Sequence, residues 1–478
     1  MIREGEAAVK APASRFTLHA PRFIHQKAVS RDRQGACPKS ANMKRPLRLA
    51  IIGCGSRAKT YTRIAAGLPE LYETVAAVDP IPSRRDAIKS SSGNSSLDEY
   101  ETAEQFLALP KCADIVVLAT QDHQHGPQAI AAIEKGYDLL LEKPIATSLE
   151  DVLAVEEAAN RLERRVVVCH VLRYAPFYQR VKEIVTSGAL GRIISIQATE
   201  GVGTFHQAHS YVRGHWNREE ESSPMILAKS SHDMDILHWL ADSICERVSS
   251  YGGVSFFRPE SRPAGATDNC FGNCPHVGAC AYDAHLYLTS ESMWLQHIQP
   301  NLSTVSQSPE ETLAWLKTSP WSRCVYQGRN SAVDHQVVLL EFQNGITATF
   351  TMTAFAKGRT IEIYGTDACL RGGEFYKETF GCDIVLTRHD GKNDQRINVD
   401  FAEDIGYSGH GGGDSGLMKS LHAAMTSPSR NQKSTLLSSS VESHRMAFAA
   451  NESRKNGGAA ILVRRADGHL PVSSVPSL

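Results

Sequence analysis

The residues with the clearest chemical pattern lie in a glycine-rich turn and at an acidic position downstream of it. An apolar run is followed by Gly53-Cys-Gly55-Ser-Arg-Ala58. In this spacing Gly53 permits a turn, Gly55 lets the backbone approach a pyrophosphate closely, and Ala58 lets the next helix pack tightly. Asp79 ends a second apolar run 24 residues after Gly55, where a carboxylate accepts hydrogen bonds from ribose hydroxyls. The pattern predicts a dinucleotide site at a helix N-terminus. The alternative for Asp79 is a helix N-cap.

The residues that follow Asp79 bear on which dinucleotide binds. Pro80 stands next to it in place of an arginine, which favours NAD. Arg84 and Arg85 are close enough to keep NADP as the alternative. NAD is therefore the predicted cofactor.

Short apolar runs alternate with helix-like segments along the first third of the chain. This order predicts right-handed crossovers and a parallel, doubly wound sheet, which is a Rossmann domain. The expected strands are Ala50–Gly53, Val75–Asp79, Ile115–Thr120, Leu139–Leu141 and Val166–Cys169, separated by helix-like segments such as Gln128–Glu134 and Leu149–Arg164. Because ligands bind at the carboxyl ends of such strands, His123, His125, Glu142 and Lys143 are expected at the nicotinamide end.

A second chemical cluster is Lys229-Ser-Ser-His232-Asp-Met-Asp235, which continues into an apolar helix-like run. On a helix, Lys229 and His232 fall on one face, so their side chains can point into one cleft. An imidazole suits acid–base work because its pKa lies near neutral. The alternative is a hydrogen-bonded structural histidine.

The sequence resembles the Gfo/Idh/MocA oxidoreductases, the group of glucose–fructose oxidoreductase and inositol dehydrogenase. The resemblance rests on the Gly53-Cys-Gly55 turn, on Thr120-Gln-Asp-His-Gln-His125 and, most specifically, on Glu142-Lys143-Pro144. It implies that Lys143 lies between the nicotinamide and the substrate, where a cation favours a developing alkoxide. It also implies an α+β second domain with an open, largely antiparallel sheet, which often forms dimers or tetramers in the family. The predicted cofactor contacts are Gly53, Gly55, Ser56, Arg57, Ala58, Asp79, Thr120, His125, Glu142 and Lys143.

The helix that begins near Lys229 matches the catalytic helix of that family, in which the histidine is the general base. Many members carry an aspartate four residues before the histidine, but here that position is Ala228. The family's acid–base relay therefore cannot be carried over intact. We expect His232 to be the base, Lys143 and Lys229 to orient and polarise the oxygen, and Asp235 to help orientation.

Substrate contacts are expected from two loop-like stretches and from the start of the second domain. Residues 204–217 mix aromatic rings, hydroxyls, histidines and an arginine, which suits stacking on a carbohydrate. Gly409-His-Gly-Gly-Gly-Asp414 is a glycine-rich loop that faces the active site in the sugar-acting relatives the chain resembles. The predicted substrate contacts are Arg173, Tyr211, Arg213, Trp216, Asp235 and His410.

Residues 255–333 look like an insertion that carries cysteines. Soft sulfur ligands that suit a structural zinc ion are offered by Cys270, Cys274 and Cys280, with His276 among them. The spacing of these cysteines is unusual for a zinc site. The alternative is a set of reduced, buried thiols. The eleven cysteines of the whole chain are an odd, scattered set, typical of reduced thiols in the cytoplasm.

Length and composition place these segments in four parts. The expected boundaries are a basic, disordered extension over 1–42, the Rossmann domain over 43–169, the substrate-binding and oligomerisation domain over 170–460, and a tail over 461–478. The extension has two alternative interpretations, a targeting peptide or an upstream translation artefact before Met43. A net charge of -1 and the lack of a spanning apolar run argue against nucleic-acid and membrane partners.

The predicted function is transfer of hydride between NAD and a hydroxyl of a sugar, sugar derivative or polyol, by a homo-oligomer. One alternative is a related enzyme that retains its NAD and cleaves glycosides by transient oxidation and elimination. The other is a dinucleotide-sensing protein without catalysis. The presence of both Lys143 and His232 argues against the sensor.

Overall fold

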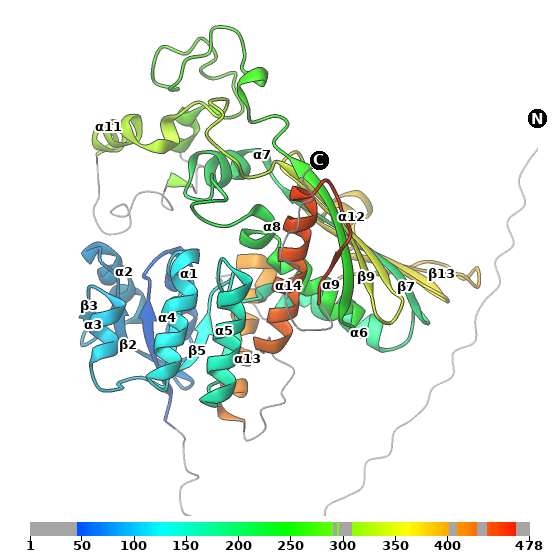
Figure 1. The fold of residues 1–478 in the computed structure, drawn as a ribbon, viewed down its shortest axis with the longest axis horizontal. Coiled ribbons are helices and arrows are strands. Elements are labelled where there is room, and N and C mark those ends of the chain that lie inside the picture. Colours follow the sequence, from blue (N-terminus) through cyan, green and yellow to red (C-terminus); the bar gives the residue numbers. More distant parts are fainter. Residues whose placement is uncertain (1–44, 290–293, 296–307, 401–408, 428–436, 465–478) are drawn as a thin grey trace, which may run out of the picture. The chain divides into compact units, whose positions relative to one another are not determined.

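The computed structural model describes residues 45–289, 294–295, 308–400, 409–427 and 437–464. The expected extension over 1–42 and residues 465–478 of the expected tail lie outside these ranges. The described residues contain a six-stranded sheet and a nine-stranded sheet (Figure 1). The expected combination of a parallel Rossmann sheet with a largely antiparallel second sheet is confirmed.

The six-stranded sheet is parallel and has the strand order β3-β2-β1-β4-β5-β6. Its strands are β1 (Leu47–Ile52), β2 (Tyr72–Val78), β3 (Asp98–Tyr100), β4 (Ile115–Leu118), β5 (Asp138–Leu141) and β6 (Val166–Val168). The helices between them are α1 (Ser56–Ala66), α2 (Pro82–Ser92), α3 (Ala103–Ala108), α4 (Asp122–Glu134) and α5 (Leu149–Arg161). All four residues of β4 are buried, because helices cover both faces of the sheet.

Successive side chains of β1 enter two different cores. Ala50 and Ile52 pack with α3, α4 and α5, whereas Leu49 and Ile51 pack with α1 and α2 on the other face. This alternation follows from the two-residue period of a strand. It explains why the strands read as continuous apolar runs.

The second sheet has the order β14-β13-β12-β11-β7-β10-β9-β8-β15, and only β7 and β10 pair in parallel. Its strands are β7 (Ile193–Val202), β8 (Cys245–Gly253), β9 (His335–Phe342), β10 (Thr347–Thr353), β11 (Lys357–Gly365), β12 (Ala368–Gly373), β13 (Ile384–Arg388), β14 (Gln395–Ile397) and β15 (Ile461–Leu462). Buried and exposed residues alternate along β9, so one face of the sheet packs on the core and the other is open.

Short helices connect the two sheets and cover the second one. They are η1 (Val171–Tyr174), α6 (Pro176–Thr186), α7 (Thr204–His206), the π-helix η2 (Gln207–Arg213), α8 (Met225–Ala228), α9 (Ser231–Ala241) and α12 (Glu374–Phe380). The segment between β8 and β9 contains η3 (Pro259–Ser261), η4 (Ala284–Leu288), α11 (Pro309–Thr318) and η5 (Pro320–Ser322). Ser308 and Glu311 form a capping box that starts α11.

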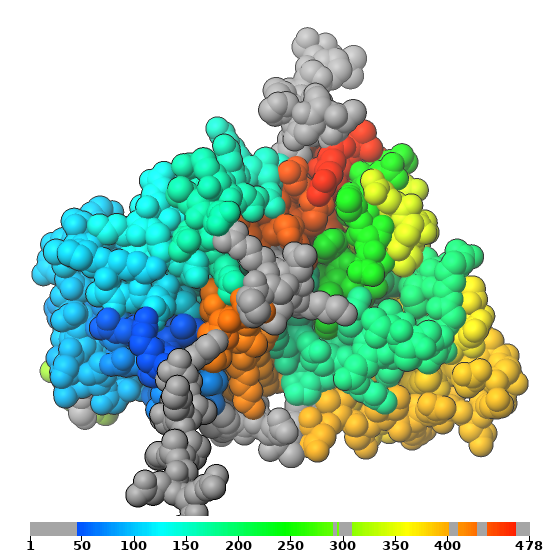
Figure 2. All heavy atoms as spheres, turned by 90° about the horizontal axis from the view of Figure 1, so that it is seen from below, coloured from blue at the N-terminus to red at the C-terminus, as the bar shows by residue number. Residues whose placement is uncertain are grey.

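The C-terminal helices return to the Rossmann domain. After the turn η6 (Gly409–Gly412), Leu417, Met418 and Leu421 of α13 (Gly413–Thr426) join the core beneath α1. Figure 2 shows the orange surface of α13 beside the blue surface of the first elements. The Arg165 guanidinium donates to the carbonyl oxygens of Ala424, Met425 and Ser427 at 2.7–2.8 Å, which caps the end of α13.

The long helix α14 (Leu437–Lys455) packs against α5, α9 and β8, and so contacts both domains. Leu437 and Val441 enter the Rossmann core, and Met446 and Ala450 enter the core of the second domain. Among the described residues, no helix combines the length and the apolar character that crossing a membrane requires.

Candidate active site

The glycine turn after β1 forms an open cradle for a phosphate group. Gly53 has φ +85°, and a Cβ there would lie 2.5 Å from the Ala119 carbonyl oxygen, so only glycine fits. Gly55 is the N-cap of α1, and no atom lies within 4 Å of the position its Cβ would take. Ala58 is fully buried and lets α1 pack closely. The turn therefore leaves room for a dinucleotide pyrophosphate at the N-terminus of α1, whose first residue is Ser56.

A pocket of about 390 Å³ continues from this turn to the ends of β2 and β4. Its lining includes Gly53, Gly55, Asp79, Thr120 and Gln124. The Asp79 carboxylate accepts hydrogen bonds from the backbone N–H groups of Cys54 and Ile81, both at 2.9 Å. Ile81, not Asp79, is the N-cap of α2, so the alternative role of Asp79 as a cap is not seen. The carboxylate is fixed at the pocket wall, where a ribose would lie.

Arg57 and Glu142 contact each other across the start of α1 and the end of β5. Arg57 Nε lies 2.8 Å from Glu142 Oε1, and the Tyr61 hydroxyl donates to the same oxygen at 2.6 Å. Arg57 Nη2 lies 2.6 Å from Asp414 Oδ1, which brings in α13. Burial alone would raise the pKa of the Glu142 carboxyl, but Arg57 and Lys143 outweigh it and hold that pKa below its usual value. These contacts hold Glu142 ionised beside Lys143.

Thr120 and His125 organise the loop after β4. Both ring nitrogens of His125 face carbonyl oxygens, Nδ1 that of Pro144 at 2.6 Å and Nε2 that of Thr120 at 3.2 Å. The Thr120 hydroxyl donates to Gln128 Oε1 at 2.8 Å. Thr120 lines the dinucleotide pocket, whereas His125 is buried and joins two loops.

Lys143 reaches from the end of β5 to the second domain. Its Nζ donates to the carbonyl oxygen of Ala228 at 2.5 Å. Burial lowers the pKa of the Lys143 ammonium from its usual value, although Glu142 and Asp122 oppose this. A lysine of lowered pKa is suited to exchange a proton with a substrate oxygen.

His232 lies on α9, close to Lys143. The residue is 4% exposed, and its Nδ1 atom is buried without a hydrogen-bond partner among the described residues. The rings of His170 and His410 lie 5.8 and 5.7 Å from its ring centroid. Burial, Lys143 and His410 hold the pKa of His232 well below its usual value. The imidazole is therefore neutral, which is the form that a general base needs, and the lowered pKa makes it a weaker base than a free imidazole.

Lys229 belongs to a buried group of charges that the sequence did not reveal. Its Nζ lies 3.1 Å from Glu200 Oε1, and Arg359 Nε lies 2.6 Å from Glu200 Oε2 and 2.8 Å from Asp233 Oδ1. Arg359 and Glu200 are direct partners in the register of β11 and β7, so strand pairing was needed to find them. Burial raises the pKa of Asp233, against the opposing effect of Arg359.

The predicted substrate residues fall in different surroundings. Tyr211 stacks on Trp216, whose indole nitrogen donates to Asp122 Oδ2 at 2.9 Å. Arg173 donates to both oxygens of Asp235 at 2.5 and 2.6 Å, and both residues are buried. These contacts favour a supporting role for Arg173 and Asp235 over direct contact with a substrate.

His410 is partly exposed, whereas Arg213 is buried. The His410 side chain is 31% exposed, its residue has φ +54°, and its Nδ1 lies 3.3 Å from Asp414 Oδ2. Arg213 is buried and donates to the carbonyl oxygens of Arg323 and Tyr282, both at 2.7 Å. Its partners belong to the segment between β8 and β9, which favours a structural role for Arg213.

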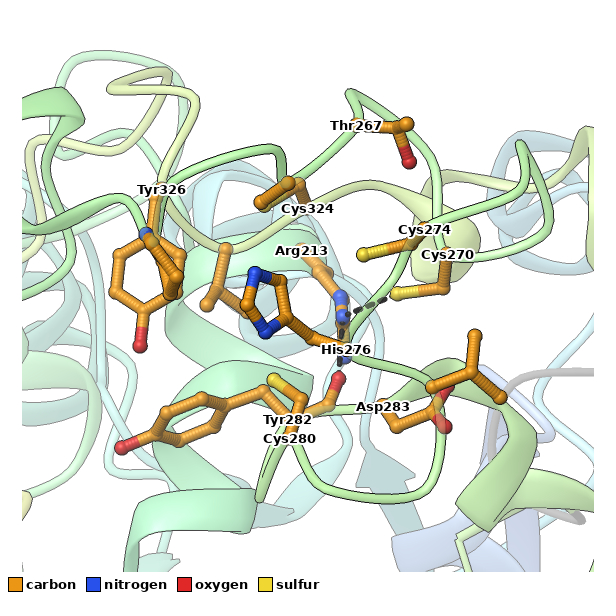
Figure 3. A pocket seen from close by; sticks show the side chains of 14 residues that line it. Arg213, Thr267, Cys270, Cys274, His276, Cys280, Tyr282, Asp283, Cys324 and Tyr326 are labelled. Atoms are coloured by element: carbon orange, nitrogen blue, oxygen red, sulfur yellow. Dashed lines mark hydrogen bonds between the residues drawn. The ribbon is translucent and has the colours of Figure 1, made fainter.

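The predicted zinc ligands Cys270, Cys274 and Cys280 line one small pocket together with Cys324 and His276 (Figure 3). The prediction of zinc is not supported. Within the described ranges no three His, Cys, Asp or Glu side chains are arranged to hold a metal ion. The Cys270 sulfur instead accepts a hydrogen bond from Arg213 Nη2 at 3.5 Å, and this cation opposes a second positive charge there. The three cysteines form no disulfide, but they are only partly buried, whereas the alternative interpretation expected buried thiols.

Two family models match most of the chain. Residues 47–170 match the Gfo/Idh/MocA model described as "Oxidoreductase family, NAD-binding Rossmann fold". Residues 182–394 match the companion model described as "Oxidoreductase family, C-terminal alpha/beta domain". The two matches fall on the two sheets described above.

Curated relatives carry oxidoreductase names. The putative oxidoreductase YteT of Bacillus subtilis is 24% identical over 78% of this chain and 88% of that protein. Inositol 2-dehydrogenase 3 of Saccharopolyspora erythraea is 28% identical over 41% of this chain and 54% of that protein. The chain thus spans about half of the length of the second relative.

Solved structures share the fold at low sequence identity. An oxidoreductase from Agrobacterium radiobacter, in complex with NAD+, L-tartaric acid and magnesium, has a TM-score of 0.61 and 17% identity, covering 87% of this chain and 98% of that one. The WlbA dehydrogenase from Bordetella pertussis, in complex with NADH and UDP-GlcNAcA, has a TM-score of 0.59 and 18% identity, covering 90% of this chain and all of that one. These likenesses confirm the fold.

Proposed function

Because the chain belongs to the Gfo/Idh/MocA family of NAD-binding oxidoreductases, we propose that it oxidises a hydroxyl of a sugar, sugar derivative or polyol. The carrying observation is that Lys143 bonds to Ala228 beside the neutral, buried His232. Lys143 thus brings a cation to the carboxyl end of β5, where ligands of such sheets bind, and α9 brings a base to the same place.

The dinucleotide would be held by the glycine turn and by Asp79. The α1 N-terminus at Gly55 would face the pyrophosphate, and Asp79 would accept hydrogen bonds from the ribose. When bound, the nicotinamide supplies the acceptor for hydride. Asp79 favours NAD over NADP, because its carboxylate would repel a ribose phosphate. Arg84, with Nη1 3.8 Å from Asp79 Oδ2, is the residue through which NADP would be tolerated.

His232 would take the proton from the substrate hydroxyl as general base. The Lys143 ammonium would hydrogen-bond the same oxygen and stabilise its negative charge. Lys229, held by Glu200 at 3.1 Å, would orient the substrate from the second domain. His410, the exposed histidine beside His232, would contact the substrate from the glycine-rich loop.

Hydroxyl-rich ligands among the relatives support a sugar or polyol substrate. One relative is named inositol 2-dehydrogenase, and two solved structures contain L-tartaric acid or UDP-GlcNAcA. Trp216, which is half-buried and stacked on the buried Tyr211, adds an aromatic ring of the kind on which sugar rings pack.

We also propose a homo-oligomer that forms through the open face of the second sheet. Tyr251 on β8, Leu339 on β9 and Leu462 on β15 are 60%, 48% and 45% exposed on adjacent strands. A second copy of the chain would cover this apolar strip. Light scattering should give a dimer or tetramer, and Leu339→Glu should shift it toward monomer; a monomeric wild type would contradict the proposal.

The function is tested by incubating the purified chain with NAD or NADP and a panel of free sugars, polyols and glycosides. Reduced cofactor and released aglycone are followed together. Stoichiometric reduced cofactor is the expected result. Aglycone release without net reduction would instead indicate redox-assisted glycoside cleavage, and binding of NAD without either product would indicate a sensor.

Two variants and a matched control test the proposed roles. Lys143→Met and His232→Asn should each lower kcat on the order of 10²-fold or more, since His232 takes the reacting proton and Lys143 stabilises the charge on the oxygen. His238→Asn, on the same helix, should leave kcat near the wild-type value. Equal losses in all three variants would contradict the assignment.

A further inference from the structure

His170 is a buried histidine to which the proposed function gives no role. It follows β6, is 0% exposed, and neither ring nitrogen has a hydrogen-bond partner among the described residues. Buried polar groups in folded proteins are nearly always paired, so two unpaired nitrogens on one ring call for an explanation. The groups packed around the ring provide one.

One neighbour, His444 on α14, cannot exchange a proton with His170. Its ring lies 5.7 Å away, but its Nδ1 donates to the Ser440 carbonyl oxygen at 2.7 Å and its Nε2 accepts from the Ile145 N–H at 2.9 Å. Both nitrogens are therefore committed, and the tautomer of His444 is set by the backbone.

The remaining neighbours leave two partners for the His170 ring. Asp235 Oδ1 lies 3.9 Å from His170 Nε2, which is within reach of a small shift but longer than a hydrogen bond. The ring of His232 meets the His170 ring edge to face, with the ring centroids 5.8 Å apart. The charged groups that also face it are Arg173, which is bonded to both oxygens of Asp235, and Lys143 with Glu142 at the end of β5. Arg173 favours the ionised form of Asp235, although burial raises the pKa of this carboxyl.

We propose that Asp235, His170 and His232 move together into a hydrogen-bonded series when cofactor and substrate bind, and that this series sets the tautomer of His232. The His170 Nε2–H group donates to Asp235, and His170 Nδ1 accepts from the Nδ1–H group of His232. Nε2 of His232 is then left without a proton and free to take the one from the substrate hydroxyl. After that transfer the imidazolium keeps its Nδ1–H bond to His170, so no proton travels further. The inference rests on the proposed role of His232.

The alternative partner of His232 is His410, whose ring lies 5.7 Å from that of His232 and whose Nδ1 lies 3.3 Å from Asp414 Oδ2. His410 is 31% exposed, whereas the unpaired Nδ1 of His232 is buried. A buried nitrogen needs a partner from the buried side, and His170 is the fully buried ring beside it. His410 and His232 Nε2 are left to face the substrate together.

This arrangement also accounts for Ala228, which stands where many family members carry an aspartate. Ala228 contributes only its carbonyl oxygen, as the acceptor from Lys143. In this chain Asp235, which lies on α9 with His232, would support the base through His170. His170 is thus a positioning residue, since it acts on the substrate only through His232.

The test compares His170→Phe and His170→Asn with the wild-type holoenzyme. His170→Phe keeps a flat ring but has no acceptor, so kcat should fall on the order of 10²-fold because His232 loses its productive tautomer, with KM nearly unchanged. Losing this acceptor also destabilises the His232 imidazolium, so the acid limb of the pH profile of kcat/KM should move to lower pH. His170→Asn, whose side-chain oxygen can accept from His232, should recover part of the loss.

A spectroscopic measurement separates this role from a structural one. In the NAD-loaded chain with 15N-labelled histidine rings, wild-type His232 should carry its proton on Nδ1, and His170→Phe should shift the proton toward Nε2. An unchanged tautomer and an unshifted pH profile would overturn the inference, even if activity falls. If His170→Phe does not fold, the double variant His170→Asn/Asp235→Asn is measured in its place. An unchanged His232 tautomer in that variant would decide against the inference.

The same experiment keeps this inference apart from the proposed function. If His232→Asn retains activity, the proposed base is wrong. If His232 is required but the His170 variants match wild type, only the hydrogen-bonded series is wrong.

Discussion

The buried ion pair between Arg57 and Asp414 joins α1 to α13 and holds the glycine-rich loop of His410 against the Rossmann domain. Asp414 is 0% exposed and accepts from Arg57 Nη2 at 2.6 Å and Nη1 at 3.2 Å. Burial would raise the pKa of Asp414, but His410 and Arg57 hold it far below its usual value, so the carboxylate is ionised. Asp414→Asn removes the charge and keeps the shape.

The expected loss follows from what Arg57 keeps. Removing one partner of a fully buried ion pair costs about 3–5 kcal/mol, and a single charge-assisted hydrogen bond contributes about 1.5–3 kcal/mol. The Arg57 side chain is 31% exposed and retains Glu142, so water and that carboxylate compensate in part. We therefore expect Asp414→Asn to lower the free energy of unfolding by about 2–3 kcal/mol.

Urea denaturation without cofactor measures this loss. Asp390→Asn is the matched control, because Asp390 also pairs with an arginine, Arg388, but at an exposed turn, where no measurable loss is expected. Adding Arg57→Met to Asp414→Asn should cost less than the sum of the two single changes. Equal effects of Asp414→Asn and Asp390→Asn, or strict additivity of the double variant, would refute the reasoning.

Three further predictions concern the cradle, the buried histidines and the buried charges. Gly55→Ala adds a methyl group to space reserved for the pyrophosphate, so NAD affinity in a fluorescence titration should fall about tenfold or more, roughly 1.4 kcal/mol, while apo stability stays unchanged; unaltered affinity would contradict the cradle. Burial lowers the pKa values of His238 and His444 to about 4 and about 3, whereas the unfolded chain protonates near 6.5. The free energy of unfolding is therefore unaffected by these two rings above pH 6.5 and decreases as the pH falls toward 4, by about 1.4 kcal/mol per histidine and pH unit. Unfolding curves that do not change across this range would argue against neutral buried rings. Arg359→Gln leaves two buried carboxylates without their main cation and should cost about 3 kcal/mol in urea unfolding; a loss below that of a surface arginine variant would show that the group is hydrated.

Much of the Rossmann domain could be predicted because its signals are local. The bend at Gly53, the free space at Gly55 and the apolar runs each depend on neighbouring residues, and the structure shows the turn and the parallel sheet as expected. Strand ends also follow from this order, which is why Asp79 and Thr120 could be placed at one pocket. Lys143 was located by its short motif, and the structure shows what it contacts.

The predictions that failed or stayed open concern contacts between distant segments. The cysteines looked like a zinc site because their types and approximate spacing suit that ion, but spacing does not fix the tetrahedral approach of four ligands. Arg213 was expected to contact substrate because it lies in a stretch of aromatic rings, hydroxyls and histidines, and Arg173 was expected to do so at the start of the second domain. Both stay predictions. Their guanidinium groups bond to backbone carbonyls and to a buried carboxylate, which favours a structural role.

The sequence by itself determined the elements whose information is periodic or contiguous: the glycine turn, the alternation of strands and helices, and the helix that carries His232. Lys229, expected on that same helix, lies before it as the C-cap of α8. Tertiary structure alone decided which side chains from distant segments meet. It paired Arg359 with Glu200 through strand register, brought α13 back beneath α1, and placed His170 beside His232. Such meetings depend on the folding of segments up to hundreds of residues apart, and no local pattern of residue types records them.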